Sequence, residues 1–251
     1  AENFPKELGR CTPREILLPL SLKNNADIQS ALSSLPEISV TYYPDWHFSQ
    51  ELSYKKLVEQ FKTANLQSFS LFENSPEVPP AGFLLEYLEK TTNTDVPHVS
   101  SITVYHDSDY VIMDDSSRRN LEVTANLRDG STQFSLLECV NYTMTAMGNR
   151  MIRAWLLSPL TDCKKIMTRQ KHIALFAELL KKIREELSPV LDIERLAGRI
   201  AMDRAHGKDL QALRASLESW LAVRNSIMPY AFDGSPPENA EQIVGIIKNA
   251  I

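Results

Sequence analysis

The chain has 251 residues, which is enough for one large or two ordinary domains, and its formal net charge is −5. A stand-alone nucleic-acid-binding domain usually carries a basic excess, so this acidic balance argues against that class. The cysteines Cys11, Cys139 and Cys163 are widely spaced and odd in number, which indicates neither a disulfide framework nor a metal cluster and fits a reducing cytoplasm. No apolar run reaches the length of a membrane span, so no membrane association is expected.

The first part of the chain alternates between strand and helix patterns. Residues 15–20 form an apolar run typical of a buried strand, and the β-branched and aromatic residues 38–43 favour a second strand. Residues 27–35 between them predict a short helix, and Ser49 is a plausible N-cap for another. This order of strand, helix, strand and helix predicts a small α/β layer.

A second group of elements follows. Residues 81–91 carry their apolar side chains on one helical face, which predicts a helix. Residues 102–105 and 110–113 have strand composition, and the polar residues 106–109 between them predict a hairpin turn.

From about residue 114 the patterns become helical, and a central helix is expected over residues 146–157 because Ser158-Pro159 stops it. Its apolar side chains fall at helical spacing, and Gly148 within the pattern indicates close backbone packing. We therefore predict a structural core that includes Met147, Gly148, Trp155 and Leu156. Cys139 and Cys163 lie in apolar helical contexts and are also expected in the core. Further helices are predicted over residues 135–139, 162–187 (a long segment), 192–202, 209–227 and 238–251.

Two motifs in this half of the chain resemble the MutS family of mismatch-recognition proteins. Residues 145–156 are similar to the family pattern Thr-x-Met-Gly-x-Arg-x-Leu-x-x-Trp-Leu, with Ile152 in the place of the usual leucine. Residues 113–122 resemble the family's Asp-x-x-Thr-Arg-Arg-Asn-Leu-Glu, with Ser117 in the place of the threonine. Both motifs occur in the family's order and at its separation, so the resemblance is specific.

The resemblance implies two domains. Residues 1–112 would form an α/β connector with an RNase H-like fold that lacks its first strands, and residues 113–251 would form the first, lever-proximal part of an all-α helical core. The implied full-length parent binds mismatched double-stranded DNA, hydrolyses ATP with magnesium and recruits a MutL-type protein. It is expected to be a cytoplasmic homodimer, and this segment would couple its sites structurally.

No enzymatic activity and no bound cofactor are expected in the segment itself. An ATP site needs Gly-x-x-x-x-Gly-Lys-Ser/Thr, but Gly207-Lys208 is followed by Asp209 and lacks the upstream glycine. The family's mismatch reader carries Phe-x-Glu, and we interpret the similar Phe176-Ala177-Glu178 as helix packing instead.

Arg118, Arg119 and Arg150 are the candidate functional charges. We interpret them as holding a domain junction through carboxylates or helix C-termini. Contact with DNA phosphates is the alternative, and it is less favoured because phosphate binding usually shows a wider basic patch.

Lys55 and Lys56 lie on the helix that follows Trp46. The resemblance implies that this connector surface docks the MutL-type partner. A solvated helix face without a partner is the alternative.

Two other classes of function are weighed against this interpretation. A helical scaffold or adaptor unrelated to DNA would explain the helices and the acidity, but not the two motifs. A metal-dependent nuclease on the α/β part would need several carboxylates that converge on cations. The available ones flank turns, where aspartate is common for hydrogen-bonding reasons; they are Asp45, Asp107, Asp109, Asp114 and Asp115.

Overall fold

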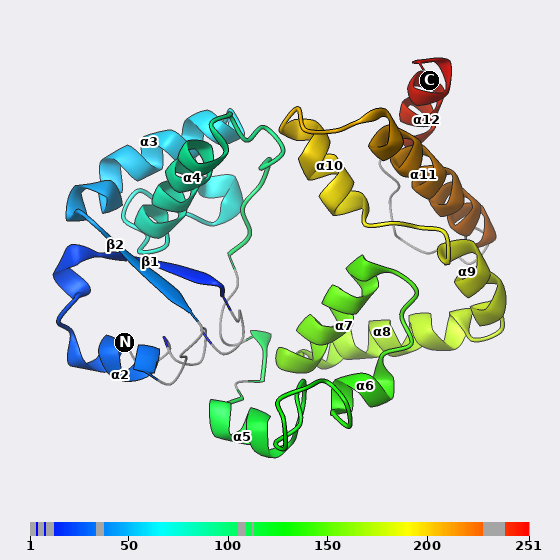
Figure 1. The fold of residues 1–251 in the computed structure, drawn as a ribbon, viewed down its shortest axis with the longest axis horizontal. Coiled ribbons are helices and arrows are strands. Elements are labelled where there is room, and N and C mark those ends of the chain that lie inside the picture. The colour runs from blue at the N-terminus through cyan, green and yellow to red at the C-terminus, as the bar shows by residue number, and fades with distance from the viewer. Residues whose placement is uncertain are drawn as a thin grey trace. The chain divides into compact units, whose positions relative to one another are not determined.

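The structure is a computed structural model that describes residues 4, 8, 13–33, 38–104, 109–111, 113–227 and 239–250. It divides into two compact units, which we call unit 1 and unit 2 (Figure 1). Unit 1 takes residues 1–106 and 112–115, and unit 2 takes residues 107–111 and 116–251.

Unit 1 contains a two-stranded parallel sheet of β1 (Glu15–Pro19) and β2 (Ser39–Tyr43), in which Ile16 lies opposite Val40. Parallel strands need a crossover connection, and here it consists of the 3-10 turn η1 (Leu20–Leu22) and helix α2 (Ala26–Ser33). Apolar side chains of β1, β2 and α2 share one hydrophobic cluster. The predicted α/β layer is therefore confirmed.

A helical pair completes unit 1. Turn η2 (Asp45–Phe48) leads into α3 (Gln50–Phe61), and α3 packs against α4 (Val78–Thr92), as Figure 1 shows. Ser49 caps α3 as predicted, since its side chain accepts a hydrogen bond from the Leu52 amide. The core of this pair is formed by buried aliphatic side chains from both helices and from the loops around them: Leu57, Leu66, Leu71, Val78, Leu85 and Val96.

The hairpin predicted around residues 106–109 is wrong in the part that the structure describes. Residues 102–104 form no strand, because Ile102 and Val104 pack their side chains against the α3–α4 core instead. Tyr110 forms an isolated antiparallel bridge with Leu160, far along the chain. Residues 105–108 lie outside the described residues.

Unit 2 is helical. Its described helices are α5 (Asp115–Asn120, whose first residue falls in unit 1), α6 (Leu136–Val140), α7 (Ala146–Leu157), α8 (Cys163–Phe176), α9 (Leu180–Leu187), α10 (Ile193–Ala201), α11 (Gly207–Ile227) and α12 (Ala240–Ala250). Helices α9, α10 and α12 pack on α11. The buried core of this assembly comes from α10, α11 and α12, and it consists of Leu196, Leu213, Leu217 and Ile247. Across the described part of the chain, no helix combines the length and the apolar character that a membrane span needs.

The bounds of α7 match the prediction, because Thr145 accepts a hydrogen bond from the Gly148 amide at 3.0 Å and begins the helix. The long helical segment predicted from residue 162 is two helices instead. The backbone turns at residues 177–179 through i to i+3 hydrogen bonds, one of them from the Leu179 amide to the Phe176 carbonyl. Helix α9 therefore starts anew at Leu180.

Candidate functional site

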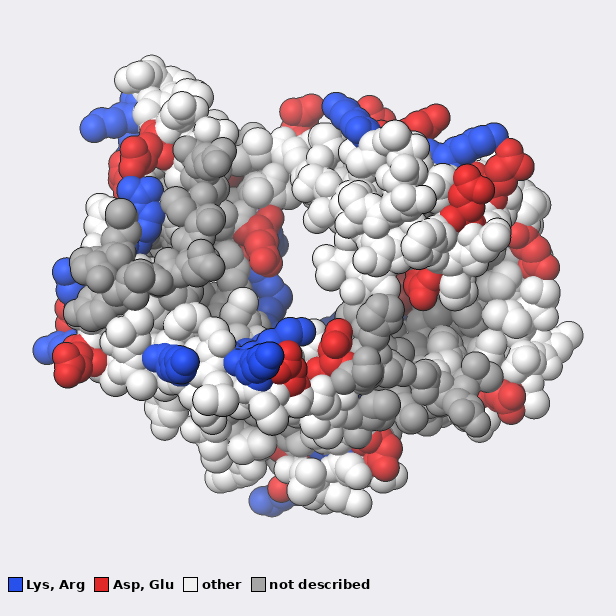
Figure 2. Space-filling model, turned by 180° about the vertical axis from the view of Figure 1, so that it is seen from behind, with Lys and Arg blue, Asp and Glu red and all other residues white. Residues whose placement is uncertain are grey.

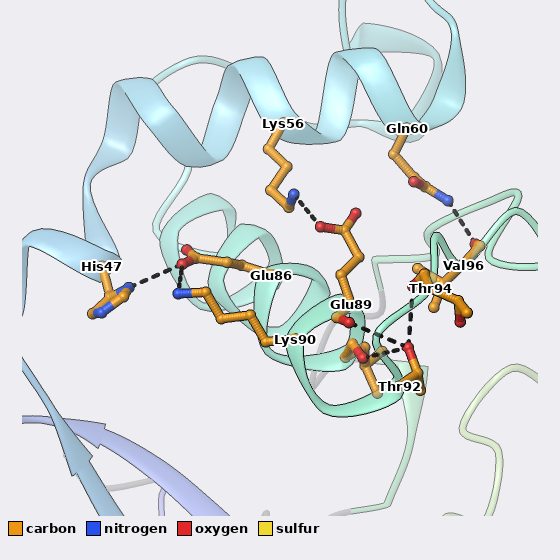
Figure 3. Close-up of polar contacts among 10 residues, drawn as sticks. His47, Lys56, Gln60, Glu86, Glu89, Lys90, Thr92, Thr94 and Val96 are labelled. Carbon is orange, nitrogen blue, oxygen red and sulfur yellow. Dashed lines mark hydrogen bonds and ion pairs between the residues drawn. The ribbon is translucent and has the colours of Figure 1, made fainter.

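Lys55 and Lys56, the predicted docking residues, have different surroundings on α3 (Figure 3 shows Lys56). The Lys56 Nζ lies 2.6 Å from the Glu89 Oε2 of α4, and both side chains are about 30% exposed, at 30% and 28%. The Lys55 Nζ pairs with Glu51 one turn away on its own helix, and it stays largely exposed. Lys56 thus joins two helices, whereas Lys55 faces solvent.

A second polar contact on α4 joins His47 of η2 to Glu86 (Figure 3). The His47 Nδ1 lies 3.2 Å from Glu86 Oε1, and Lys90 Nζ lies 2.5 Å from the same oxygen. Burial raises the pKa of Glu86, but the hydrogen bond from Lys90 and the nearby His47 outweigh it, so this pKa lies below its ordinary value. The contact fixes η2 on α4.

Aromatic rings surround this contact. The Trp46 ring stacks on His47 with centroids 3.6 Å apart and remains exposed, and the Phe83 ring centroid lies 5.1 Å from that of His47. Sequence reasoning missed this cluster. The run Tyr42-Tyr43-Pro44-Asp45-Trp46-His47-Phe48 was its available signal.

Polar contacts also hold the segment after α4. The Gln60 side-chain amide donates to the carbonyl oxygens of Val96 and Val99 at 2.8 Å each. Thr92 Oγ1 lies 2.8 Å from the Leu88 carbonyl oxygen and 3.1 Å from that of Thr94, so its single proton can be donated to either one (Figure 3). These contacts place the chain that follows α4 against α3.

The expectation that α7 forms a buried core is wrong for the described structure. No residue of α7 is buried, Trp155 is 38% exposed and Met151 is 56% exposed, while Met147 and Leu156 are half-buried. The Arg169 guanidinium of α8 covers the Trp155 ring at 3.8 Å from its centroid. Helical periodicity correctly placed these side chains on one face, but that face meets a cation and solvent rather than an apolar core.

Gly148 does pack closely, as predicted. A Cβ added at this position would lie 3.1 Å from Thr145 Oγ1 and 3.2 Å from Thr143 Cβ. A larger side chain at this position would therefore crowd the turn that caps α7.

Arg150 makes a bidentate ion pair with a carboxylate far along the chain. Its Nη1 and Nη2 lie 2.7 and 2.9 Å from the two carboxylate oxygens of Asp192, and its Nη2 lies 2.5 Å from Glu194 Oε2. The Arg150 hydrogen bonds lower the pKa of Asp192 to about 2, against a smaller opposing effect of burial. The predicted carboxylate pairing is present, but both partners belong to unit 2, so the expected domain-junction role is corrected for Arg150.

Arg118 and Arg119 lie in the last turn of α5, where their carbonyl oxygens accept from the Val123 and Glu122 amides, respectively. Arg118 is half-buried and Arg119 is exposed. Among the described residues on the face drawn in Figure 2, basic and acidic side chains are interspersed, and no broad basic area is seen. The junction role of these two arginines stays a prediction.

The loop that follows α5 is organised by a buried asparagine that sequence reasoning missed. Asn126 Oδ1 accepts from the amides of Arg128 and Asp129 at 2.9 Å, and its Nδ2 donates to the Gln133 carbonyl oxygen at 2.9 Å. Asparagine commonly bonds to the backbone two or three residues on in this way. The Asn-x-x-Asp-Gly pattern was the available signal.

The carboxylates considered for a metal site and the cysteines predicted in the core remain to be placed. Asp45 Oδ1 accepts from the Ser21 amide at 3.0 Å, and within the described residues no three histidine, cysteine or carboxylate side chains form a group that could hold a metal. Asp107 and the side chain of Asp115 lie outside this description. Cys139 and Cys163 are exposed free thiols, so their predicted place in the core is wrong.

Comparison with known proteins identifies both halves of the chain. A family model described as MutS domain II matches residues 1–100, and one described as MutS domain III matches residues 116–251. A DNA mismatch repair protein MutS from Treponema denticola is 48% identical over 230 residues, which cover 90% of this chain and 26% of the relative. One from Treponema pallidum is 38% identical over 100% of this chain and 29% of the relative, and one from Symbiobacterium thermophilum is 37% identical over 87% and 25%.

The chain therefore spans about a quarter of the length of the curated relatives it matches. The domain III match alone covers more than half of the chain, and the domain II match precedes it in the same order as the two compact units. The helix motif around Arg150 and the motif around Arg118 both fall within the matched part or at its edge. The chain belongs to the MutS family of DNA mismatch repair proteins.

Proposed function

We propose that this chain is the connector and the first part of the core of a MutS-type parent protein. Residues 1–112 would form the RNase H-like connector, and residues 113–251 the lever-proximal core. The parent would be a cytoplasmic homodimer that binds mismatched double-stranded DNA, hydrolyses ATP with magnesium and recruits a MutL-type protein. The observation that carries the proposal is the succession of a domain II match and a domain III match along one chain.

The segment itself would couple these sites structurally rather than perform chemistry. This is supported by the kind of contacts that its motif residues make. Arg150 links two helices through carboxylates, and Gly148 lies against the turn that caps α7. Contacts of this kind hold helices in defined positions, and coupling between distant sites is carried by such networks of packed and hydrogen-bonded elements.

Binding to DNA tests whether mismatch recognition lies outside this segment. The chain is titrated with a short mismatched duplex and its matched control across a salt series. We expect weak binding that disappears as salt rises, with equal affinity for the two duplexes, because only counterion release would drive it. A clear preference for the mismatch would overturn the proposal and assign mismatch reading to this segment.

The same titration separates the two roles of Arg118 and Arg119. In the double variant Arg118→Gln/Arg119→Gln, the salt slope should equal that of Arg153→Gln/Lys62→Gln, which removes two charges elsewhere. A slope that falls in the first variant only would assign phosphate contacts to α5.

A chimera tests the parent's function. The matching region of the Treponema denticola protein is replaced by this chain, and mutation rates are measured in bacteria that lack their own MutS. We expect the chimera to lower the mutation rate, while the same protein with the region deleted should not. A chimera that folds and binds mismatched DNA but leaves the rate unchanged would contradict the coupling role.

A further inference from the structure

Among the described residues of unit 2, the buried hydrophobic cluster lies in one part of the unit and does not extend into the other. The leading part comprises residues 116–176 with α6, α7 and α8, and the trailing part comprises residues 180–250 with α9 to α12. The hydrophobic cluster described in unit 2 takes all its members from α10, α11 and α12 in the trailing part. In the leading part, neither α7 nor α8 has a buried residue. The two parts therefore depend on other contacts for their relative position.

Two arginines make such contacts. Arg150 of α7 holds both carboxylate oxygens of Asp192 and one of Glu194, at the start of α10. Arg184 of α9 donates its Nη1 to the carbonyl oxygen of Tyr142, in the loop before α7. The leading part therefore supplies the donor of one contact, and the trailing part supplies the donor of the other.

The Arg150 contact acts on the helix itself. Asp192 is the N-cap of α10, and its Oδ1 also accepts from the Arg195 amide at 3.3 Å. The guanidinium is thus bound to the carboxylate that begins α10, and α10 packs on α11. A displacement of α7 would therefore be transmitted to α10 and α11 through the contacts of Arg150.

The chain between the two parts can act as a hinge. Helix α8 ends at Phe176 and α9 begins at Leu180, with a turn at residues 177–179. Hinges are typically a few residues between elements that absorb a change in backbone angles. This turn is short and lies where the leading part meets the trailing part.

We infer that Arg150 and Arg184 form an ionic latch that closes the leading part of unit 2 on its trailing part about the turn at residues 177–179. The Arg150 side chain is 50% exposed, so salt or a competing anion reaches the pair. Breaking the pair would therefore open the latch. As the coupling element of the parent it rests on the proposed function, but the latch itself is a property of this chain.

The distance between the two parts tests the latch. Spin labels are placed on the exposed Cys139 of α6 and on Gln211→Cys of α11, with Cys11 and Cys163 changed to serine. Double electron–electron resonance then gives the distance distribution. We expect Arg150→Met to increase the population of longer distances severalfold. High salt should also increase that population in the labelled chain that keeps Arg150.

Three further variants make the result specific. Asp192→Asn keeps an oxygen that can cap α10 but removes the charge, so it should open the latch like Arg150→Met. The double variant should open it no further than Arg150→Met alone, because Arg150→Met already removes the bonds to Asp192 and to Glu194. Arg153→Met removes the same charge from the same helix and should leave the distribution unchanged.

Two results would overturn the inference. One is an unchanged distribution in both Arg150→Met and Asp192→Asn, with circular dichroism showing intact helices. The other is an equal change in Arg153→Met, which would attribute the effect to the charge of α7 rather than to the pair. Either result concerns the latch alone, since mutation rates of the chimera test the proposed function separately.

Discussion

The Arg169 guanidinium of α8 lies 3.8 Å from the centroid of the Trp155 ring of α7 and covers one of its faces. Trp155 is 38% exposed, so its contribution to stability comes from this cation–π contact and from partial burial. The contact joins two helices that carry no buried residues of their own. It is the motif tryptophan's main described partner.

We expect Trp155→Ala to lower the free energy of unfolding by about 1–2 kcal/mol, well below the roughly 3–5 kcal/mol of a fully buried tryptophan. Urea denaturation measures this loss. Arg169→Gln should cost about 0.5–1 kcal/mol, and in the double variant this second loss should vanish because the ring is already absent. A loss above about 3 kcal/mol for Trp155→Ala would show that the ring is buried in solution.

The close crossing of α3 and α4 makes a second prediction. A Cβ added at Gly82 would lie 2.4 Å from Ser53 Cβ and 2.6 Å from its Cα, so the helices must separate to admit it. Gly82→Ala should therefore destabilise the chain by about 1–3 kcal/mol, the usual cost of overpacking.

The matched control for this change is Gly198→Ala in α10. Nothing lies within 4 Å of a Cβ added there, and alanine favours a helix interior by about 1 kcal/mol over glycine. Thermal unfolding should therefore show opposite shifts for the two alanines. If both variants are stabilised, the helices do not cross as closely as the structure describes.

The local structure was largely predictable from the sequence. The bounds of α7 follow from its cap at Thr145 and the stop at Ser158-Pro159, both of which act within one turn of the chain. The cap of α3 at Ser49 was predicted for the same reason. Signals of this kind need no information about distant segments.

Burial and partners were not predictable in the same way. The apolar period of α7 shows which side chains share a face, but not whether anything covers that face, so Trp155 was wrongly placed in a core. Arg150 was expected to meet carboxylates, yet its partner Asp192 is 42 residues away and was recognised only as a helix start. Residues 102–104 have strand composition, but Ile102 and Val104 pack against the α3–α4 core and the segment forms no strand.

The Arg150–Asp192 pair predicts a dependence of stability on pH. The folded-state pKa of Asp192 is about 2, below its ordinary value of 3.8, so the unfolded chain binds this proton more readily. The stabilisation is complete above about pH 4 to 5 and is lost as the pH falls towards 2. The urea midpoints of the unmodified chain and of Asp192→Asn should differ by a constant amount at neutral pH. The difference should shrink as the pH falls towards 2.

Because the difference between the two proteins is measured, the pH dependence contributed by other carboxylates cancels. Glu15, Glu51, Glu86 and Asp129 also have lowered pKa values, but they are common to both proteins. A difference in midpoint that stays constant from neutral pH down to pH 3 would contradict the pairing.

The two lysines of α3 provide the last prediction. Lys56 joins α3 to α4 through Glu89 at 2.6 Å, and both side chains are partly shielded from solvent. Lys56→Gln should therefore lower the free energy of unfolding by about 0.5–1 kcal/mol, whereas Lys55→Gln should stay within about 0.5 kcal/mol of the parent chain.

Partner binding should show the opposite order. If α3 docks a MutL-type protein through charge, Lys55→Gln should weaken binding more than Lys56→Gln, because Lys55 faces solvent and pairs only with Glu51 on its own helix. Surface plasmon resonance with the Treponema denticola chimera as the immobilised protein measures both variants, with Lys62→Gln as a control near the end of the same helix. Equal affinities for all three would leave α3 as a solvated face, and the docking role would then have to be sought elsewhere on unit 1.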